Sequence, residues 1–386
     1  MRPNALSLVL ALAVCAAACA SNPGLQPGSS EPFVRRPLPD AMKARRAIAY
    51  SGYRTGENPD LQTYPSEAEI KEDLDLLVKG GWGLIRLFDT GPHAERVLKV
   101  IRDNHLDLKV MLGVWISGGK ASHDAENRDQ IDRCVALVNQ YDELVAAISV
   151  GNETLDDWSN VRTPPADLAG YIADVRKKVT QPVTTDDSYL PFLLGKDGAT
   201  DYADVIQVIR AADFLSIHVY AFADAFYDSW DYKQAAVAEP ERALAMMNAA
   251  IAYTKQSVRD VHETLAGQNL DVPVVIGEWG WKSATSGTAT SEPERAIERF
   301  FAHPVNQKIF YDAIVDWVYG KARDGDSPAI AFYFEAFDEP WKDIDDNWGL
   351  FDVGRQAKYV MWDAFPERKP ADAPAYAAKD AVYWKP

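Results

Sequence analysis

The strongest constraint on the fold of this chain is the alternation of eight short strand-like runs with helical stretches. Each run is rich in β-branched or aromatic residues, and this alternation is typical of a parallel sheet surrounded by helices. A count of eight predicts an α/β fold, the closed (β/α)8 or TIM barrel, rather than an open sheet. The expected strands are 47–53, 83–88, 109–115, 146–150, 182–185, 214–220, 272–277 and 329–335.

Helix boundaries can be recognised between these runs. Ser66 and Glu69 have the spacing of a capping box, in which each side chain satisfies a free backbone N–H of the other residue. Gly80 and Gly81 then close that helix. Pro164 and Pro165 open another helix before residues 166–179.

The N-terminal segment has the features of an export signal, with a basic start, an apolar core and small residues before a cysteine. Residues 16–19, Ala-Ala-Ala-Cys, resemble the lipobox of bacterial lipoproteins, which implies a signal peptide over 1–18 and lipidation of Cys19. An unlipidated secretory signal is the alternative. Residues 19–40 are then a flexible tether, and 41–386 form one catalytic domain. The expected location is the outer membrane, cell surface or periplasm, with the lipid as the membrane contact.

Composition excludes several classes of partner. The formal net charge of −17 argues against nucleic acid, whose phosphates need a basic surface, and fits an uncharged ligand. The mature chain retains only Cys134, so it has no internal disulfide, and helical periodicity predicts a buried thiol. No phosphate-binding or nucleotide motif is present, so no cofactor is expected, and we expect a monomer.

Two glutamates stand where a barrel places its catalytic groups. Glu153 follows the fourth expected strand and Glu278 ends the seventh. Catalytic groups of barrel enzymes lie at the C-terminal ends of the strands, so these carboxylates can face each other across the barrel mouth. Paired carboxylates cleave glycosidic bonds, with retention at a separation of ~5–5.5 Å and inversion at ~6.5–9.5 Å. The sequence does not give this separation.

Four segments resemble glycoside hydrolase family 17, the β-1,3-glucanase family. They are Val-Gly-Asn-Glu at 150–153, Glu-Trp-Gly-Trp-Lys-Ser at 278–283, Phe-Asp-Glu-Pro-Trp-Lys at 337–342 and Ile-Arg-Leu-Phe-Asp at 85–89. The resemblance implies that Glu153 is the proton donor, Glu278 is the nucleophile, and Glu339 and Lys342 are auxiliary groups. It implies a retaining enzyme that binds β-glucan.

The chain also departs from the family pattern. Gly277 and Trp279 replace the small hydroxyl residues that often flank the nucleophile, and Lys282 stands where proline is common. These differences resemble the bacterial and fungal branch more than the plant endoglucanases. They leave open whether cleavage is internal and whether water or a second sugar completes the reaction.

Further residues are candidates for substrate binding. Asn152 is expected to bond the sugar 2-hydroxyl, and Tyr220 to orient the nucleophile. Trp115, Trp281 and Tyr53 are expected to face the ligand, because aromatic faces stack on sugar rings. Three further aromatic residues are candidate stacking platforms: Trp341, Trp348 and Phe222. Glu335 is expected to bind either sugar or a cation such as Lys342.

Two pairs of residues are expected to have structural roles. Arg86 and Asp89 support the site, and Trp317 and Trp362 pack internally.

No metal site is predicted. His218 has no second histidine or cysteine at a ligand-like spacing, so a hydrogen-bonded structural role is favoured. The acidic residues of 343–352 lack the regular spacing of a calcium loop. The loops 222–240 and 283–293 follow the sixth and seventh strands and are candidates for shaping the cleft.

The favoured function is a retaining β-1,3-glucan hydrolase. A glucan transglycosylase with the same glutamates is the nearest alternative. A surface glycan-binding lipoprotein without turnover is the alternative from another class, and the presence of both glutamates counts against it.

Overall fold

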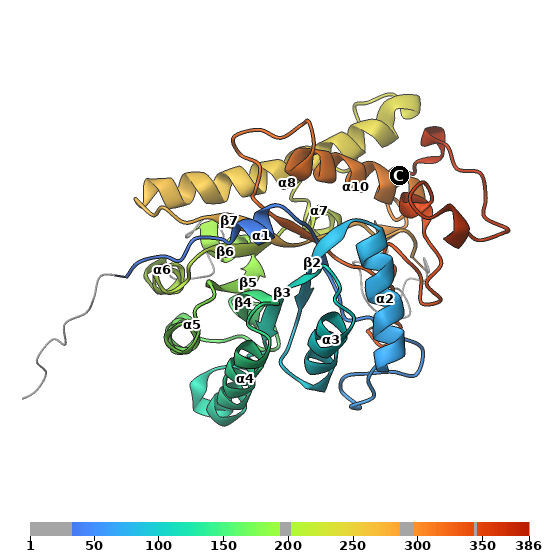
Figure 1. Ribbon diagram of the computed structural model, residues 1–386. Coiled ribbons are helices and arrows are strands. Elements are labelled where there is room, and N and C mark those ends of the chain that lie inside the picture. The colour runs from blue at the N-terminus through green and yellow to red at the C-terminus, as the bar shows by residue number, and fades with distance from the viewer. Residues whose placement is uncertain (1–32, 194–201, 286–296, 343–345, 386) are drawn as a thin grey trace, which may run out of the picture. The chain divides into compact units, whose positions relative to one another are not determined.

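A closed barrel of eight parallel strands in chain order forms the core, as predicted (Figure 1). The computed structural model describes residues 33–385 apart from 194–201, 286–296 and 343–345. The barrel belongs to the compact unit Arg35–Pro386. Its strands are β1 Arg46–Ala49, β2 Trp82–Leu87, β3 Lys109–Val114, β4 Val145–Asn152, β5 Val183–Ser188, β6 Leu215–His218, β7 Val274–Trp279 and β8 Ala331–Tyr333.

Helices surround the barrel, as Figure 1 shows. They are α1 Asp40–Lys43, α2 Glu67–Lys79, α3 Pro92–Asp103, α4 Lys120–Gln140, α5 Pro165–Lys178, α6 Tyr202–Ala211, α7 Ala221–Asp224, α8 Glu239–Gly267 and α10 Pro304–Tyr319, with short 3₁₀ turns η1 to η5 at Leu190–Leu193, Ala225–Tyr227, Tyr359–Met361, Pro366–Arg368 and Ala378–Asp380. Among the described residues, no helix has the length and apolar character needed to cross a membrane.

The predicted helix signals have clear structural consequences. Ser66 caps α2 and forms both bonds of the capping box with Glu69. Gly81 follows the helix with φ +84°, a left-handed conformation that suits glycine. Pro165 is the first residue of α5.

The strand ends differ most from prediction in β5, β1 and β8. β5 continues to Ser188, beyond the expected end at 185. The prediction stopped early because residues 186–188 are polar, but these residues pair with β6. β1 and β8 are shorter than expected. The residues that follow them instead leave the sheet and build the walls of the barrel mouth.

The lower part of the barrel is closed by an apolar cluster. Leu84, Met111, Phe214 and Phe332 are buried together there with Met42 of α1. Arg86 of β2 follows Leu84 by two residues, and Ser216 of β6 follows Phe214 by two residues; both are also buried. Since alternate residues of a strand point to the same side, the barrel interior changes from apolar to polar toward the C-terminal ends of the strands.

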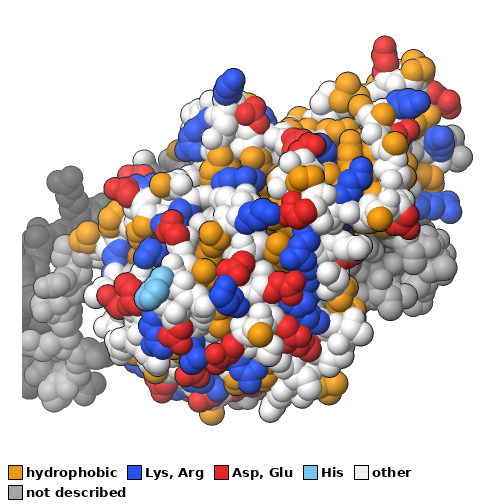
Figure 2. Space-filling model, turned by 45° about the vertical axis from the view of Figure 1, so that its right-hand side comes forward, with side chains coloured by type: hydrophobic (Ala, Val, Ile, Leu, Met, Phe, Trp, Pro, Cys, Tyr) orange, Lys and Arg blue, Asp and Glu red, His pale blue; other side chains and the backbone are white. Residues whose placement is uncertain are grey.

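The charged surface and Cys134, the cysteine of the described residues, agree with the sequence analysis. Figure 2 shows acidic and basic side chains interspersed on one face of the molecule. Cys134 is buried, and burial raises the pKa of its thiol to about 12. A buried thiol with this pKa is unreactive, as predicted for a packing residue. Residues 1–32, including Cys19, lie outside the described part of the chain.

Candidate active site

Glu153 is presented by a tight turn at the end of β4. Gly151 has φ +88° and Glu153 has φ +51°, so two residues of the turn are left-handed. The Glu153 backbone N–H donates to the Asp186 carbonyl at 2.7 Å, which fixes the turn against β5. A side chain at Gly151 would meet Thr154 at 2.9 Å. The local backbone therefore requires glycine beside the glutamate.

Glu278 projects into the same region because the sheet is irregular around it. The register shifts on both sides of β7, between Ile217 and His218 and between Ile276 and Trp279. Such irregularities re-aim side chains and are common beside active sites. The Glu278 carboxylate accepts hydrogen bonds from Arg86 and, at 2.6 Å, from the Tyr220 hydroxyl.

His218 lies between the two glutamates. Its Nδ1 is 2.9 Å from Glu153 Oε1, and its Nε2 is 3.7 Å from Glu278 Oε1. Asp186 completes the buried group, with Oδ2 accepting from Arg86 Nε at 3.0 Å. One ligand-type atom each of Glu153, His218 and Glu278 lies within 4.8 Å of the others. Two carboxylates, one from β4 and one from β7, thus meet around a single imidazole.

The surroundings shift the two carboxyl pKa values in opposite directions. Burial raises the pKa of Glu153, and the charge of Glu278 adds to this, while the hydrogen bond with His218 opposes it. Burial by itself would raise the pKa of Glu278 too, but the charges of His218 and Arg86 and the Tyr220 hydrogen bond hold it below its usual value. One carboxyl group is thereby suited to donate a proton and the other to stay ionised.

The charged network also explains the state of His218. Burial lowers its pKa, but Glu278, Asp186 and Glu153 outweigh burial and raise it to about 10. Burial likewise disfavours ionised Asp186, yet Arg86 and His218 lower its pKa to about 2. His218 is therefore an imidazolium near neutral pH, and it donates its Nδ1–H to Glu153.

The Gly277 departure from the family pattern has a steric cause. A Cβ at this position would lie 2.1 Å from Asp186 Oδ1 and 2.4 Å from Ser216 Oγ. A hydroxyl residue does not fit without moving the carboxylate that holds Arg86. Gly277 on β7 is therefore required by the buried Asp186 on β5, which leaves no room for a side chain.

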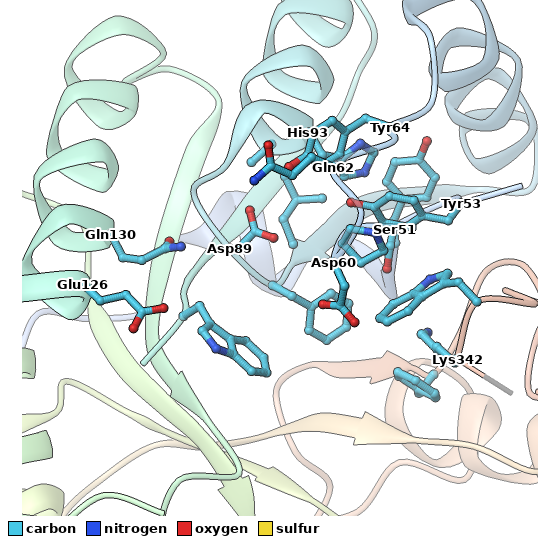
Figure 3. A pocket seen from close by; sticks show the side chains of 18 residues that line it. Ser51, Tyr53, Asp60, Gln62, Tyr64, Asp89, His93, Glu126, Gln130 and Lys342 are labelled. Atoms are coloured by element: carbon cyan, nitrogen blue, oxygen red, sulfur yellow. The ribbon is translucent and has the colours of Figure 1, made fainter. Parts of the chain in front are cut away.

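Figure 3 shows a cleft of about 560 Å³, whose lining does not include Glu153, His218 or Glu278. It adjoins the catalytic centre through two lining residues: the Phe88 ring lies 4.6 Å from the Arg86 guanidinium, and the Phe334 ring lies 6.0 Å from the Tyr220 ring. Its walls come from the segments after β1, β2, β3 and β8 and from helices α3 and α4. The predicted residues that line it are Tyr53, Asp89, Trp115, Trp341 and Lys342. The long loop 222–240 does not contribute to its lining, and 286–293 lies outside the described residues.

Two predicted platforms are wrong in this structure. Trp281 is fully buried, packs on Phe310 and donates its indole N–H to the Phe301 carbonyl at 2.9 Å. Phe222 is buried against the same tryptophan and Trp348. The Gly-Trp step after Glu278 turns the indole outward into the packing against α10, so it cannot stack on a sugar.

The acidic residues after β8 support the cleft wall from behind. Glu339 is buried and accepts from the Gly52 backbone N–H at 2.7 Å and from the Trp341 indole at 2.8 Å. Glu335 is buried and paired with Lys342, which is the cation alternative. Neither glutamate lines the cleft, so in this structure Glu339 supports Trp341, and the cation alternative, not the sugar alternative, describes Glu335.

Of the other predicted residues, Asn152 and Arg86 contact the catalytic centre and Asp89 does not. Asn152 accepts a hydrogen bond from Arg86 through Oδ1 and is partly exposed, which leaves its amide N–H groups for a ligand. Arg86 is fully buried between Glu278 and Asp186. Asp89 accepts from the Gly91 backbone N–H at 2.5 Å and shapes the turn into α3.

Sequence reasoning missed the central place of His218 and Asp186. The alternation of 216–220 puts His218 and Tyr220 on one side, which is a usable signal for a residue beside the nucleophile. Asp186 stands in the polar run 184–188, which lacks the apolar character expected of a strand end. His218, Glu153 and Glu278 could ligate a cation, but Arg86 already occupies the Glu278 carboxylate.

The sequence comparisons agree with this geometry. Residues 47–355 match the family model of the BtgE/BtgC glycoside hydrolase domain. The chain belongs to this family. The matched segment contains Glu153, Glu278 and the residues described above that contact them.

Relatives of this BtgE/BtgC domain include a protein of Aspergillus niger named as a glucan endo-1,3-beta-glucosidase, btgC. It is 27% identical over 320 residues, which cover 77% of this chain and 40% of the relative. The chain thus spans about two fifths of the length of that relative.

Two solved structures share the fold. An endo-laminarinase from Formosa Hel1_33_131 is 28% identical with a TM-score of 0.72, over 85% of this chain and 88% of the other. A family 17 beta-1,3-glucanosyltransferase from Rhizomucor miehei is 21% identical with a TM-score of 0.56, over 82% and 96%. The second likeness establishes a common fold.

Proposed function

We propose that the protein is a retaining glycoside hydrolase that cleaves β-1,3-glucan. The observation that carries the proposal is the meeting of Glu153 and Glu278, with carboxylate oxygens within 4.8 Å of each other. Oxygens this close match the ~5–5.5 Å separation of retaining enzymes better than the ~6.5–9.5 Å of inverting ones. The names of two similar proteins, the Aspergillus niger glucan endo-1,3-beta-glucosidase and the Formosa endo-laminarinase, support the choice of substrate.

In the proposed reaction, Glu278 attacks the anomeric carbon while Glu153 protonates the departing oxygen. Tyr220 and Arg86 keep the nucleophile ionised and fix its orientation. The imidazolium of His218 binds Oε1 of Glu153, which leaves Oε2 to carry the acid proton. In the second step Glu153 removes a proton from water, whose oxygen displaces Glu278 from the sugar.

Digestion of laminarin, lichenan and cellulose tests the substrate. We expect shorter oligosaccharides from laminarin, little from cellulose, and β-configured products in the first minutes by NMR. Initial α-configured products or a preference for cellulose would refute the proposal. Products longer than the laminari-oligosaccharide supplied would assign the second step to sugar transfer instead of water.

The pH profile of kcat/KM should depend on His218. Glu278 must be ionised, so activity falls as pH drops through its lowered pKa; Glu153 must be protonated, so activity falls as pH rises through its raised pKa. The charge of His218 lowers both values. We therefore expect His218→Asn to move both limbs of the profile to higher pH.

Tyr220→Phe is the matched control for this experiment. It removes a hydrogen bond to Glu278 alone, so we expect the acidic limb to move upward while the alkaline limb moves much less. Unchanged limbs in His218→Asn, despite a folded enzyme, would show that the imidazole does not tune the glutamates.

We also propose export and lipid anchoring through Cys19, on the sequence of residues 1–19. In cells that process lipoproteins, labelled palmitate should be incorporated into the full chain and lost in Cys19→Ser. A wild-type chain that is exported without label would favour the unlipidated signal.

A further inference from the structure

Three carboxylates of the cleft have no cationic partner. Asp60, Asp89 and Glu126 line the cleft, and Figure 3 shows them on separate walls around the hollow. Over the described ranges, none of the three takes part in an ion pair. Asp60 and Glu126 are exposed, and Asp89 is half-buried.

Two of the three cations near the cleft, Lys342 and Arg86, are paired with carboxylates, and Arg96 is bound to a carbonyl. Lys342 is the lysine of the lining, and it is paired with Glu335 and, at 3.1 Å, with Glu339. Arg86, at the base of the site, is held by Glu278 and Asp186. Arg96 is not part of the lining; it donates to the Pro65 carbonyl at 3.0 Å, and its guanidinium is 5.6 Å from the centroid of the Tyr64 ring. The lining itself therefore carries a net negative charge.

His93 does not change this balance. It lines the cleft but is only 6% exposed, and the backbone of Ser51 is the polar group that interacts with its ring. Burial lowers its pKa to about 4, so the ring is neutral at pH 7. Both ring nitrogens are themselves buried, so the imidazole adds no positive charge to the cleft surface.

The shape of the cleft suits a chain of sugars. Trp115 and Trp341 are partly exposed in its lining and offer apolar faces. A second hollow of about 370 Å³ is lined by the same Gln62, Tyr64 and Asp89. Its one cation, Arg133, is paired with Asp129 at 2.7 Å.

We propose that Asp60, Asp89 and Glu126 make this cleft selective for an uncharged glucan and exclude chains whose sugars carry carboxylate, sulfate or phosphate groups. This inference rests on the proposed β-1,3-glucanase activity. Carboxylates accept strong hydrogen bonds from sugar hydroxyls, whereas like charges in a concave site repel an anionic ligand and reduce its encounter rate. The three carboxylates then add to specificity by repelling anionic chains, in addition to the contacts that the cleft makes with a neutral glucan.

The test compares two soluble β-1,3-glucans of equal length and equal degree of substitution. One carries carboxymethyl groups and the other carries neutral hydroxyethyl groups of similar size. We expect kcat/KM to be lower for the carboxymethyl polymer by about tenfold or more at low salt, and the gap to narrow as salt screens the charges. The hydroxyethyl polymer controls for steric exclusion.

The decisive variant is Asp60→Asn, Asp89→Asn and Glu126→Gln combined. We expect it to bring the two kcat/KM values to within about threefold of each other. A matched variant, Glu143→Gln, Glu263→Gln and Asp372→Asn, changes the net charge equally at exposed positions outside the cleft lining, and should keep the wild-type ratio.

Equal kcat/KM values for both polymers in the wild type, or a ratio that both triple variants change alike, would overturn the inference. Single substitutions distinguish misfolding of the triple variant from a true effect, because each should narrow the ratio by part of the total. Failure of the wild type to cleave either the hydroxyethyl polymer or unmodified laminarin would instead refute the proposed function.

Discussion

Replacing Glu278 with glutamine is expected to lower kcat on laminarin by more than the roughly 10²–10⁴-fold that a general acid contributes. The amide keeps the size of the side chain but cannot form the glycosyl ester. It also removes the charge that Arg86 and Tyr220 now hold in place. The measurement is initial rate on laminari-oligosaccharides, with circular dichroism to verify folding.

Chemical rescue distinguishes the two glutamates. On an aryl glycoside with a good leaving group, azide should give a β-glycosyl azide with Glu153→Ala and an α-glycosyl azide with Glu278→Ala, because the anion replaces the base in one case and the nucleophile in the other. A 2-fluoro glycoside should label Glu278 in the wild type. Label on another residue, or an active Glu278→Gln enzyme, would remove the nucleophile assignment.

Replacing Asp73 with asparagine is expected to reduce the free energy of unfolding by about 3–5 kcal/mol. Asp73 is fully buried on α2 and accepts two hydrogen bonds of 2.7 Å from Arg355, which is also fully buried. Without the carboxylate, the guanidinium remains charged in a buried site. Arg355 also donates to the Gly52 carbonyl at 2.7 Å, so the wall of the cleft would loosen as well.

Asp75 provides the matched control on the same helix. It is exposed and forms an ion pair with Lys71 at 2.6 Å. Exposed pairs contribute ~0–1 kcal/mol, so Asp75→Asn should leave urea unfolding almost unchanged. Equal shifts for the two variants would contradict the importance of the buried Asp73–Arg355 pair.

The barrel could be predicted because its signals are local. Alternating runs of apolar strand and amphipathic helix impose the parallel sheet, and the Ser66 capping box and the Pro165 helix start depend on neighbouring residues alone. The positions of Glu153 and Glu278 followed from counting strands. A local sequence pattern predicts the position of a residue when the residues that it interacts with lie within the same helical turn or the same strand.

The failures concern residues whose partners are distant in the chain. Trp281 follows a strand end like a ligand-facing residue, yet its environment is made by Phe301 and Phe310. The family resemblance makes Glu339 an auxiliary group of the site, but its carboxylate accepts from the Gly52 backbone N–H in the loop after β1. Neither outcome can be read from a motif, because long-range packing decides which side of a wall a side chain faces.

The sequence by itself determined an eight-stranded barrel with one glutamate after the fourth strand and another at the end of the seventh. Tertiary structure alone decided that their oxygens lie within 4.8 Å, with His218 between them, and that Asp60, Asp89 and Glu126 share one cleft. The reason is physical: strand periodicity is set by the backbone, whereas distances and pKa values arise from side chains that closure of the barrel brings together.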